Sequence, residues 1–187
     1  MMEATMEQSD PHARRVAKST PCSRDEMLRR IARFGESSPD RNAFPDLADP
    51  ARDRSVTYLL SPGETAGPAQ IAEPHQFHMA ISKLRRGVNP VTHAHPYAEV
   101  FMPLDAHFRF FWGENLEESV DLAPWDVISV PAGVFRSFEC LDRDEGHVLT
   151  LFDTGGDPHT GITVPQEMFD KYYSKGWRPT PDMTKAG

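Results

Sequence analysis

The chain lacks any long apolar run: none of its hydrophobic stretches approaches the roughly 18 residues that a membrane-crossing helix needs. It also lacks a basic excess, because 28 acidic residues outnumber 20 basic ones and the formal net charge is −8. A duplex-binding surface requires a basic patch, so nucleic acid is not an expected partner. Residues 1–10 show neither the basic start nor the apolar core of a secretory signal, and no membrane partner is expected.

Cysteine is scarce as well, since Cys22 and Cys140 are the only two in the chain. A disulfide framework is therefore not expected, and a reducing cytoplasm is the predicted location. Cys140 lies in an apolar stretch with no activating base beside it in the sequence. This context predicts a small core residue and not a catalytic thiol.

Proline is abundant, with 17 residues, many of them in the first third of the chain and near its C-terminus. This distribution predicts one compact domain with poorly ordered ends. The length of 187 residues suits one domain with a substantial core. We expect an N-terminal arm over 1–54, a barrel over 55–155 and a C-terminal extension over 156–187.

A short helix is predicted in the arm, at about 23–34. Ser23 and Glu26 have the spacing of a capping box, and Gly35 suits the end of the helix. Apolar side chains recur at helical spacing on one face, as Met27, Ile31 and Phe34. Such a face is expected to pack against the rest of the protein or against a second subunit.

From about residue 55, short runs of β-forming residues alternate with turn residues. Runs such as QFHMAISKL and HVLTLFDT are separated by turn sequences such as RRGVNP and DRDEG. Short strands at this spacing are typical of an all-β sandwich or barrel. A later segment, PQEMFDKYYSKGW, predicts a short C-terminal helix that starts at Pro165 and ends at Gly176.

The stretch VTHAHPYAEV brings together residues that can bind a metal ion. His93 and His95 share one face of an extended chain because side chains alternate along a strand. Pro96 and Tyr97 allow a turn, after which Glu99 can face the same space from a neighbouring strand. Two imidazoles and one carboxylate suit Fe(II) or Mn(II) and leave positions open for substrate and O₂. The alternative is a set of hydrogen-bonded polar residues on a strand.

The spacing around these residues resembles the first motif of the cupin superfamily. Gly87 opens the motif, and His93, His95 and Glu99 stand at its ligand positions. Ala106 stands where a closing glycine is usual.

The stretch WDVISVPAGVFR is similar to the second cupin motif. Asp126, Pro131 and Gly133 match it, whereas Trp125 replaces the opening glycine and Arg136 replaces the histidine that is the fourth ligand in metal-binding cupins. The resemblance covers roughly residues 55–153. It implies an all-β double-stranded β-helix, or jelly-roll, barrel with a short N-terminal helix and a C-terminal helix, and by the same resemblance a homodimer.

Arginine cannot replace the histidine as a ligand, because its guanidinium has no acceptor and does not deprotonate. Three interpretations stay open. In one, His93, His95 and Glu99 hold the metal while Arg136 clamps a substrate oxyanion. In another, a different histidine completes the site. In the third, Arg136 and Glu99 form a buried ion pair in a metal-free binding module.

The best candidate for an additional ligand is His78, which lies on the strand before the first motif, ahead of His75 and His147. His107 alternates with inward-facing phenylalanines and is expected to point outward. Six aromatic residues cluster around the two motifs, and such residues either fill a small barrel or line an apolar pocket. They are Phe101, Phe108, Phe110, Trp112, Phe135 and Phe138.

The resemblance implies a metal-dependent cupin enzyme. The first expectation is a non-haem Fe(II) dioxygenase-like oxidoreductase that acts on a small acidic or phenolic substrate, with Mn, Ni or Zn as alternative metals. Glu99 would serve as the anionic ligand, and Arg136 would hold the anionic substrate and stabilise developing negative charge. The alternatives are a non-catalytic cupin that binds a small acidic ligand through Arg136, and a metal-assisted isomerase or lyase.

Overall fold

The protein is described here by a computed structural model in which eight strands form two antiparallel sheets. The sequence predicts poor order at both ends of the chain, and residues 1–17 and 177–187 lie outside the described residues. The structure describes residues 18–41, 43–52, 54–60, 69–71, 75–153 and 160–176.

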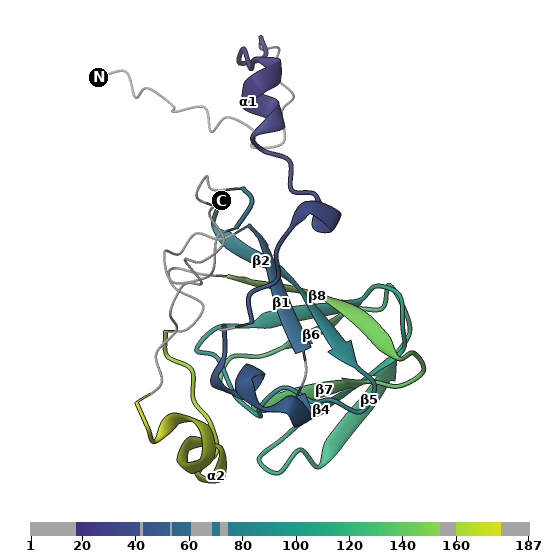
Figure 1. Ribbon diagram of the computed structural model, residues 1–187, viewed down its shortest axis with the longest axis vertical. Coiled ribbons are helices and arrows are strands. Elements are labelled where there is room, and N and C mark those ends of the chain that lie inside the picture. The colour runs from purple at the N-terminus through teal and green to yellow at the C-terminus, as the bar shows by residue number, and fades with distance from the viewer. Residues whose placement is uncertain are drawn as a thin grey trace, which may run out of the picture.

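The larger sheet has the order β1-β2-β8-β3-β6 and the smaller sheet has the order β5-β4-β7. Figure 1 shows these strands stacked in two layers, which confirms the predicted all-β barrel. The larger sheet contains β1 (Arg54–Leu60), β2 (Phe77–Arg85), β8 (Glu145–Asp153), β3 (Glu99–Pro103) and β6 (Ile128–Val130). The smaller sheet contains β5 (Glu118–Leu122), β4 (Phe108–Trp112) and β7 (Arg136–Cys140).

The core lies between the two sheets and is rich in phenylalanine. Side chains of β2 alternate between buried and partly exposed along the whole strand, so one face of the strand is turned into the barrel. Phe110 and Phe138 stack with ring centroids 5.3 Å apart, from adjacent strands of the smaller sheet. Cys140 is buried in the same cluster as a free thiol, as the sequence predicts. Most of the predicted pocket aromatics therefore serve the core.

Two turns of the barrel use the left-handed backbone region. Gly87 and Gly133 have φ angles of 72° and 76°, which glycine adopts without a Cβ penalty. Trp125, which replaces the glycine of the second motif, adopts φ 76° in spite of its side chain. Its backbone N–H donates to the Pro103 carbonyl at 2.9 Å, and this bond holds the strained residue in place. The turn geometry is thus kept where the glycine is absent.

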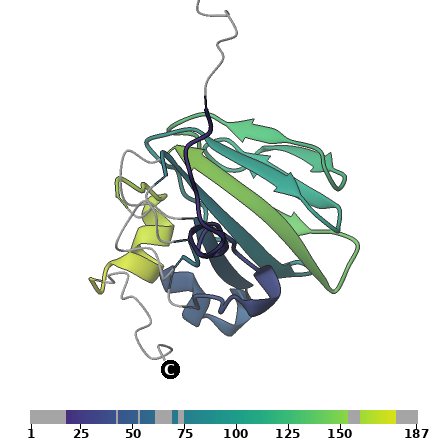
Figure 2. The same cartoon turned by 90° about the horizontal axis from the view of Figure 1, so that it is seen from above.

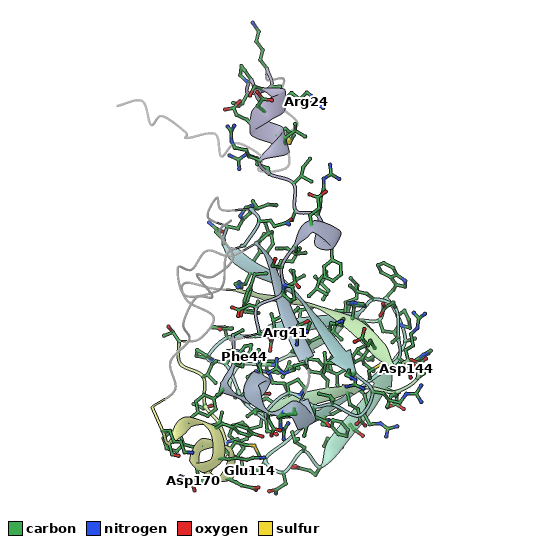
Figure 3. The ribbon with its side chains drawn as sticks, viewed as in Figure 1. Arg24, Arg41, Phe44, Glu114, Asp144 and Asp170 are labelled. Atoms are coloured by element: carbon green, nitrogen blue, oxygen red, sulfur yellow. The ribbon has the colours of Figure 1, made fainter. Side chains whose placement is uncertain are left out.

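The N-terminal helix is shorter than the sequence predicts. Helix α1 covers Arg24–Leu28, and the chain then turns before a short 3₁₀ helix, η1 (Phe34–Glu36). The capping box of Ser23 and Glu26 is present as predicted. No residue of α1 is buried, and Figure 3 shows it projecting away from the barrel. Without a packing surface so short a helix gains little from extension, and the prediction of 23–34 was wrong.

A second part of the arm packs on the barrel and meets the C-terminal helix. It forms the 3₁₀ helices η2 (Pro45–Ala48) and η3 (Pro50–Arg52). The C-terminal segment forms α2 (Gln166–Met168) and the π-helical turn η4 (Phe169–Tyr173), close to its predicted extent. The Tyr172 hydroxyl donates to Asp49 at 3.0 Å and accepts from Arg52 Nε at 3.0 Å. In Figure 2 the yellow C-terminal helix lies beside the blue arm.

Among the described residues, no helix is both long enough and apolar enough to cross a membrane.

Candidate metal centre

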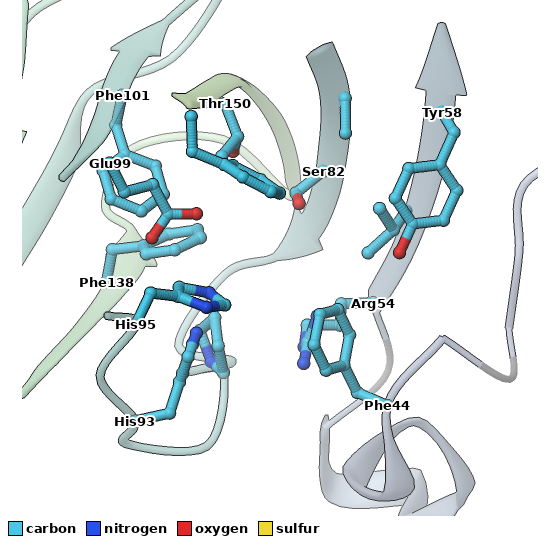
Figure 4. Close-up of a pocket in the computed structure, with 14 residues that line it drawn as sticks. Phe44, Arg54, Tyr58, Ser82, His93, His95, Glu99, Phe101, Phe138 and Thr150 are labelled. Carbon is cyan, nitrogen blue, oxygen red and sulfur yellow. The ribbon is translucent and has the colours of Figure 1, made fainter. Parts of the chain in front are cut away.

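A cavity lies between strands of the barrel, the loop that carries His93 and His95, and the arm. Its walls are mainly apolar and aromatic, with Phe101 and Phe138 from the barrel and Phe44 from the arm. Figure 4 shows His93, His95 and Glu99 on one side of this space. The form is that of a small-molecule site, which is largely apolar and carries a few polar groups.

The three residues of the predicted metal site come together in the structure. One ligand atom from each of His93, His95 and Glu99 lies within 4.8 Å of the others. The loop that carries the histidines is pinned to the second motif, because the His95 carbonyl accepts from Gly133 N–H at 2.8 Å. Glu99 begins β3 and pairs with Val130 and Phe152 on its two neighbouring strands. The group is therefore held by the barrel itself.

The surroundings of His93 prepare it as a neutral ligand. Its Nδ1 lies 2.6 Å from the Val91 carbonyl oxygen, which can only accept, so Nδ1 carries the proton and Nε2 is left for a metal ion. Burial holds the pKa of His93 well below its usual value, and the charge of Arg136 lowers this pKa further. The imidazole therefore stays neutral at physiological pH, as a metal ligand must.

The ring of His95 is oriented by stacking and by a hydroxyl group. It stacks on Tyr97 with centroids 4.9 Å apart and on Phe152 with centroids 5.6 Å apart. The Tyr97 hydroxyl lies 3.1 Å from Nδ1. Tyr97, which is only half-buried, thus helps to fix the orientation of this ligand ring.

Arg136 turns its guanidinium to the carboxylate of Glu99. Nε donates to Glu99 Oε2 at 3.0 Å, Nη2 donates to the same oxygen, and Nη1 donates to the His93 carbonyl at 3.1 Å. Burial raises the pKa of Glu99, and the Arg136 charge and hydrogen bonds oppose that rise. Both bonds from Arg136 use Oε2, so Oε1 is the oxygen left for a metal ion.

The donor set fits a divalent metal ion. Two histidines and one carboxylate offer three ligand atoms, and Arg136 and the Val91 carbonyl act as the outer partners that orient such ligands. The buried ion pair of Arg136 and Glu99 thus exists together with the ligand group of His93, His95 and Glu99. The sequence analysis had treated these two arrangements as alternatives. Arg136 is only 2% exposed, and it does not line the cavity. Nε, Nη1 and Nη2 each donate to Glu99 or to the His93 carbonyl, and the clamping of a substrate by Arg136 stays a prediction.

His78 lies outside the ligand group. Its side chain is fully buried on β2 and packs against the rings of Tyr58 and Phe152, with centroids 5.1 and 4.8 Å away. His107 points outward to Asp142, as predicted, and His147 bonds to Asp105. The structure therefore brings no further histidine to His93 and His95 among the described residues.

The arm contributes three residues that the sequence analysis missed. Phe44 and Arg54 line the cavity, and the fully buried Asp46 holds Arg54. The Arg54 guanidinium lies 5.0 Å from the Phe44 ring centroid, and the Phe44 ring lies 6.3 Å from that of His93. Their segment is polar and rich in proline, which is typical of a connector. The one available signal was a lone phenylalanine in a polar stretch.

Comparison with known proteins rests on structure, because no family model and no curated protein matches the chain. A cupin-2 domain protein from Rhodospirillum rubrum is 15% identical, with 73% of this chain and 80% of that chain covered and a TM-score of 0.54. A cupin 2 conserved barrel domain protein from Rhodopseudomonas palustris is 15% identical, with 66% and 76% covered and a TM-score of 0.49. The DMSP lyase DddQ from Ruegeria pomeroyi is 18% identical, with 72% and 59% covered and a TM-score of 0.48.

At these identities the likeness concerns the fold and not the activity. It agrees with the two antiparallel sheets of the structure. The chain therefore has the cupin fold.

Proposed function

We propose that this protein is a metal-dependent cupin enzyme whose divalent ion is held by His93, His95 and Glu99. The observation that carries the proposal is the meeting of these three ligand atoms within 4.8 Å in the wall of an apolar cavity. A facial set of two histidines and one carboxylate is typical of non-haem Fe(II) oxygenases. Fe(II) is accordingly the proposed metal, and a dioxygenase-like oxidation in the cytoplasm is the proposed reaction.

The residues of the chain have distinct tasks in this site. His93 and His95 supply neutral nitrogen donors, and Glu99 supplies one oxygen while Arg136 holds the other. The bound ion would supply Lewis-acid and redox chemistry at the cavity wall. The aromatic walls keep bulk water away and give a flat acidic or phenolic molecule apolar contacts.

The charges at the site favour an anionic substrate. A divalent ion contributes +2, and the Glu99 carboxylate and the Arg136 guanidinium cancel each other. The positive charge that remains in a mainly apolar cavity attracts a carboxylate or phenolate, and a low dielectric strengthens that attraction.

Metal content by mass spectrometry on untagged protein tests the ligand assignment. We expect close to one metal ion per chain in the wild type and none in His95→Ala. His107→Ala is the matched control, because His107 is a surface histidine that pairs with Asp142. Loss of metal in both variants, or retention in both, would contradict the assignment.

Oxygen uptake by the Fe(II)-loaded protein then tests the reaction class, with catechol and 2-hydroxybenzoate as first probes. Oxygen uptake that occurs only when a probe is added, and that is absent in His95→Ala, supports a dioxygenase-like enzyme. Turnover of a probe without O₂ would replace this reaction by a metal-assisted isomerase or lyase. Protein that binds no metal after anaerobic addition of Fe(II) would overturn the enzyme proposal.

A further inference from the structure

Arg54 is a second buried guanidinium at this cavity, and its position differs from that of Arg136. Arg54 begins β1 and lines the cavity, whereas Arg136 does not. Figure 4 shows Arg54 beside Phe44, across the cavity from His95 and Glu99. The cavity therefore has the metal-ligand group on one side and a guanidinium paired with Asp46 on the other.

Asp46 fixes this guanidinium but leaves part of it available. Arg54 Nε and Nη2 donate to the Asp46 carboxylate at 2.9 to 3.3 Å, and Asp46 also accepts from Val91 N–H at 3.2 Å. No hydrogen bond joins Arg54 Nη1 to any described residue. A guanidinium has five N–H donors, so the two N–H groups of Nη1 can still donate to a carboxylate.

The position of Arg54 at the cavity would allow its guanidinium to bind a ligand as well as to stabilise the fold. The Arg54 side chain is 5% exposed, and that remaining surface opens to the cavity that Phe44 and His93 also line. The Phe44 ring lies between the two groups, with its centroid 5.0 Å from the Arg54 guanidinium carbon and 6.3 Å from the centroid of the His93 ring. An anion bound at Arg54 therefore lies within the field of the metal-ligand group.

We propose that Arg54 is the carboxylate anchor of the cavity. Its ligand is a small organic acid whose carboxylate accepts hydrogen bonds from Arg54 Nη1 and whose apolar body lies among the aromatic walls. The other end of the acid then faces His93, His95 and Glu99, and this last step rests on the proposed function. Asp46 is a positioning residue, because it acts on the ligand only through Arg54.

Calorimetric titration of the full-length protein with benzoate and with its neutral counterpart benzamide tests the anchor. The titration is run on the protein as purified and again after removal of metal with a chelator. We expect benzoate to bind at least tenfold more tightly than benzamide in both samples. Equal affinities, or no binding of benzoate in either sample, would overturn the proposal.

Two variants separate the anchor from a merely structural ion pair. Arg54→Lys keeps the charge opposite Asp46 but removes the planar guanidinium, and it is expected to weaken benzoate binding at least tenfold. The double change Arg54→Gln with Asp46→Asn removes both charges together and is expected to abolish the preference for benzoate. Circular dichroism melting curves verify that each variant is folded. A folded variant that binds benzoate as tightly as the wild type would refute the anchor.

Arg109→Lys is the matched control, because Arg109 also donates to an aspartate through Nε and Nη2, at 2.6 and 2.8 Å to Asp121, but on the outer surface. It should leave benzoate binding unchanged. The metal-free titration also keeps the two proposals apart. Arg54-dependent binding in a protein that takes up no metal would support the anchor alone. Metal uptake without any preference for benzoate would support the metal site alone.

Discussion

Burial and the Arg136 guanidinium shift the pKa of the Glu99 carboxylate in opposite directions. The buried position raises its pKa, and the guanidinium of Arg136 opposes that rise through two bonds to one oxygen. Arginine at this position therefore does not act as a fourth ligand but fixes the third one. A lysine could not do the same, since it lacks the planar arrangement of donors.

The buried pair predicts a strong asymmetry between single and double variants. Arg136→Met leaves Glu99 buried without its counter-charge, and we expect a loss of about 3–5 kcal/mol in the free energy of unfolding. The double change Arg136→Met with Glu99→Gln should recover much of that loss. Urea denaturation of metal-free protein measures both. Arg109→Met, which breaks an exposed pair with Asp121, is the control and should change stability little.

This prediction fails if Arg136→Met unfolds at the same urea concentration as Arg109→Met. Stability would then not depend on the counter-charge of Glu99.

A second prediction concerns pH and the half-exposed carboxylate of Asp105. Burial alone would raise its pKa, but the backbone N–H and the ring of His147, at 2.8 and 2.7 Å, lower it below the ordinary value. Because the pKa is lower in the folded state, the stabilisation is present above pH 4 or so and is lost as pH falls through the folded-state pKa. Asp105→Asn should therefore be less stable than the wild type at pH 7, and the difference should shrink toward pH 3.

Urea denaturation across this pH range checks the expectation. A stability difference that stays constant down to pH 3 would show that ionisation of Asp105 is not its origin.

At the scale of the elements, β8 depends on a glycine at its point of closest approach to the smaller sheet. A Cβ added to Gly146 would lie 2.8 Å from Ala106 Cβ, 2.8 Å from Cys140 Sγ and 2.9 Å from a Phe108 ring atom. Gly146→Ala should therefore reduce the free energy of unfolding by about 1–3 kcal/mol, the usual effect of overpacking. Thermal unfolding followed by circular dichroism measures the change.

Gly35→Ala is the matched control, because a Cβ there meets nothing within 4 Å. Equal melting temperatures for the two variants would mean that β8 can shift away from Ala106 at little cost.

The N-terminal helix shows which of its features the local sequence pattern predicts and which it does not. The capping box of Ser23 and Glu26 is local chemistry, and its prediction is confirmed. The length of that helix depends on whether its apolar face finds a partner. Met27, Ile31 and Phe34 are 54%, 40% and 45% exposed, so this face is only partly covered by the described residues and the helix stops at Leu28.

At the scale of the whole molecule, the homodimer stays a prediction. It would give the exposed apolar side chains of the arm, among them Met27 and Ile31, a surface to pack on. Sedimentation velocity should report twice the chain mass of 21.0 kDa. Ile31→Asp should then raise the monomer fraction, whereas Ser19→Asp, a control charge at an exposed position, should leave it unchanged. A wild type that sediments as a monomer at all concentrations would contradict the prediction.

The sequence by itself determined what depends on short-range geometry. Alternation along an extended chain places His93 and His95 on one side, and the spacing to Glu99 brings the carboxylate back to them. The β-strand pattern, the turns at Gly87 and Gly133 and the buried Cys140 follow from the same local rules. These parts of the fold and of the site could all be predicted.

The tertiary structure decided which charges face each other. Arg136 could clamp a substrate or pair with Glu99, and the choice depended on what the closed barrel places across from β7. Asp46 lies in a segment typical of a connector, and only the packing of this segment on the barrel pairs it with Arg54 at the start of β1. A buried charged side chain pairs with whichever opposite charge the fold places beside it. The distance between the two charges in space cannot be derived from their spacing in the sequence.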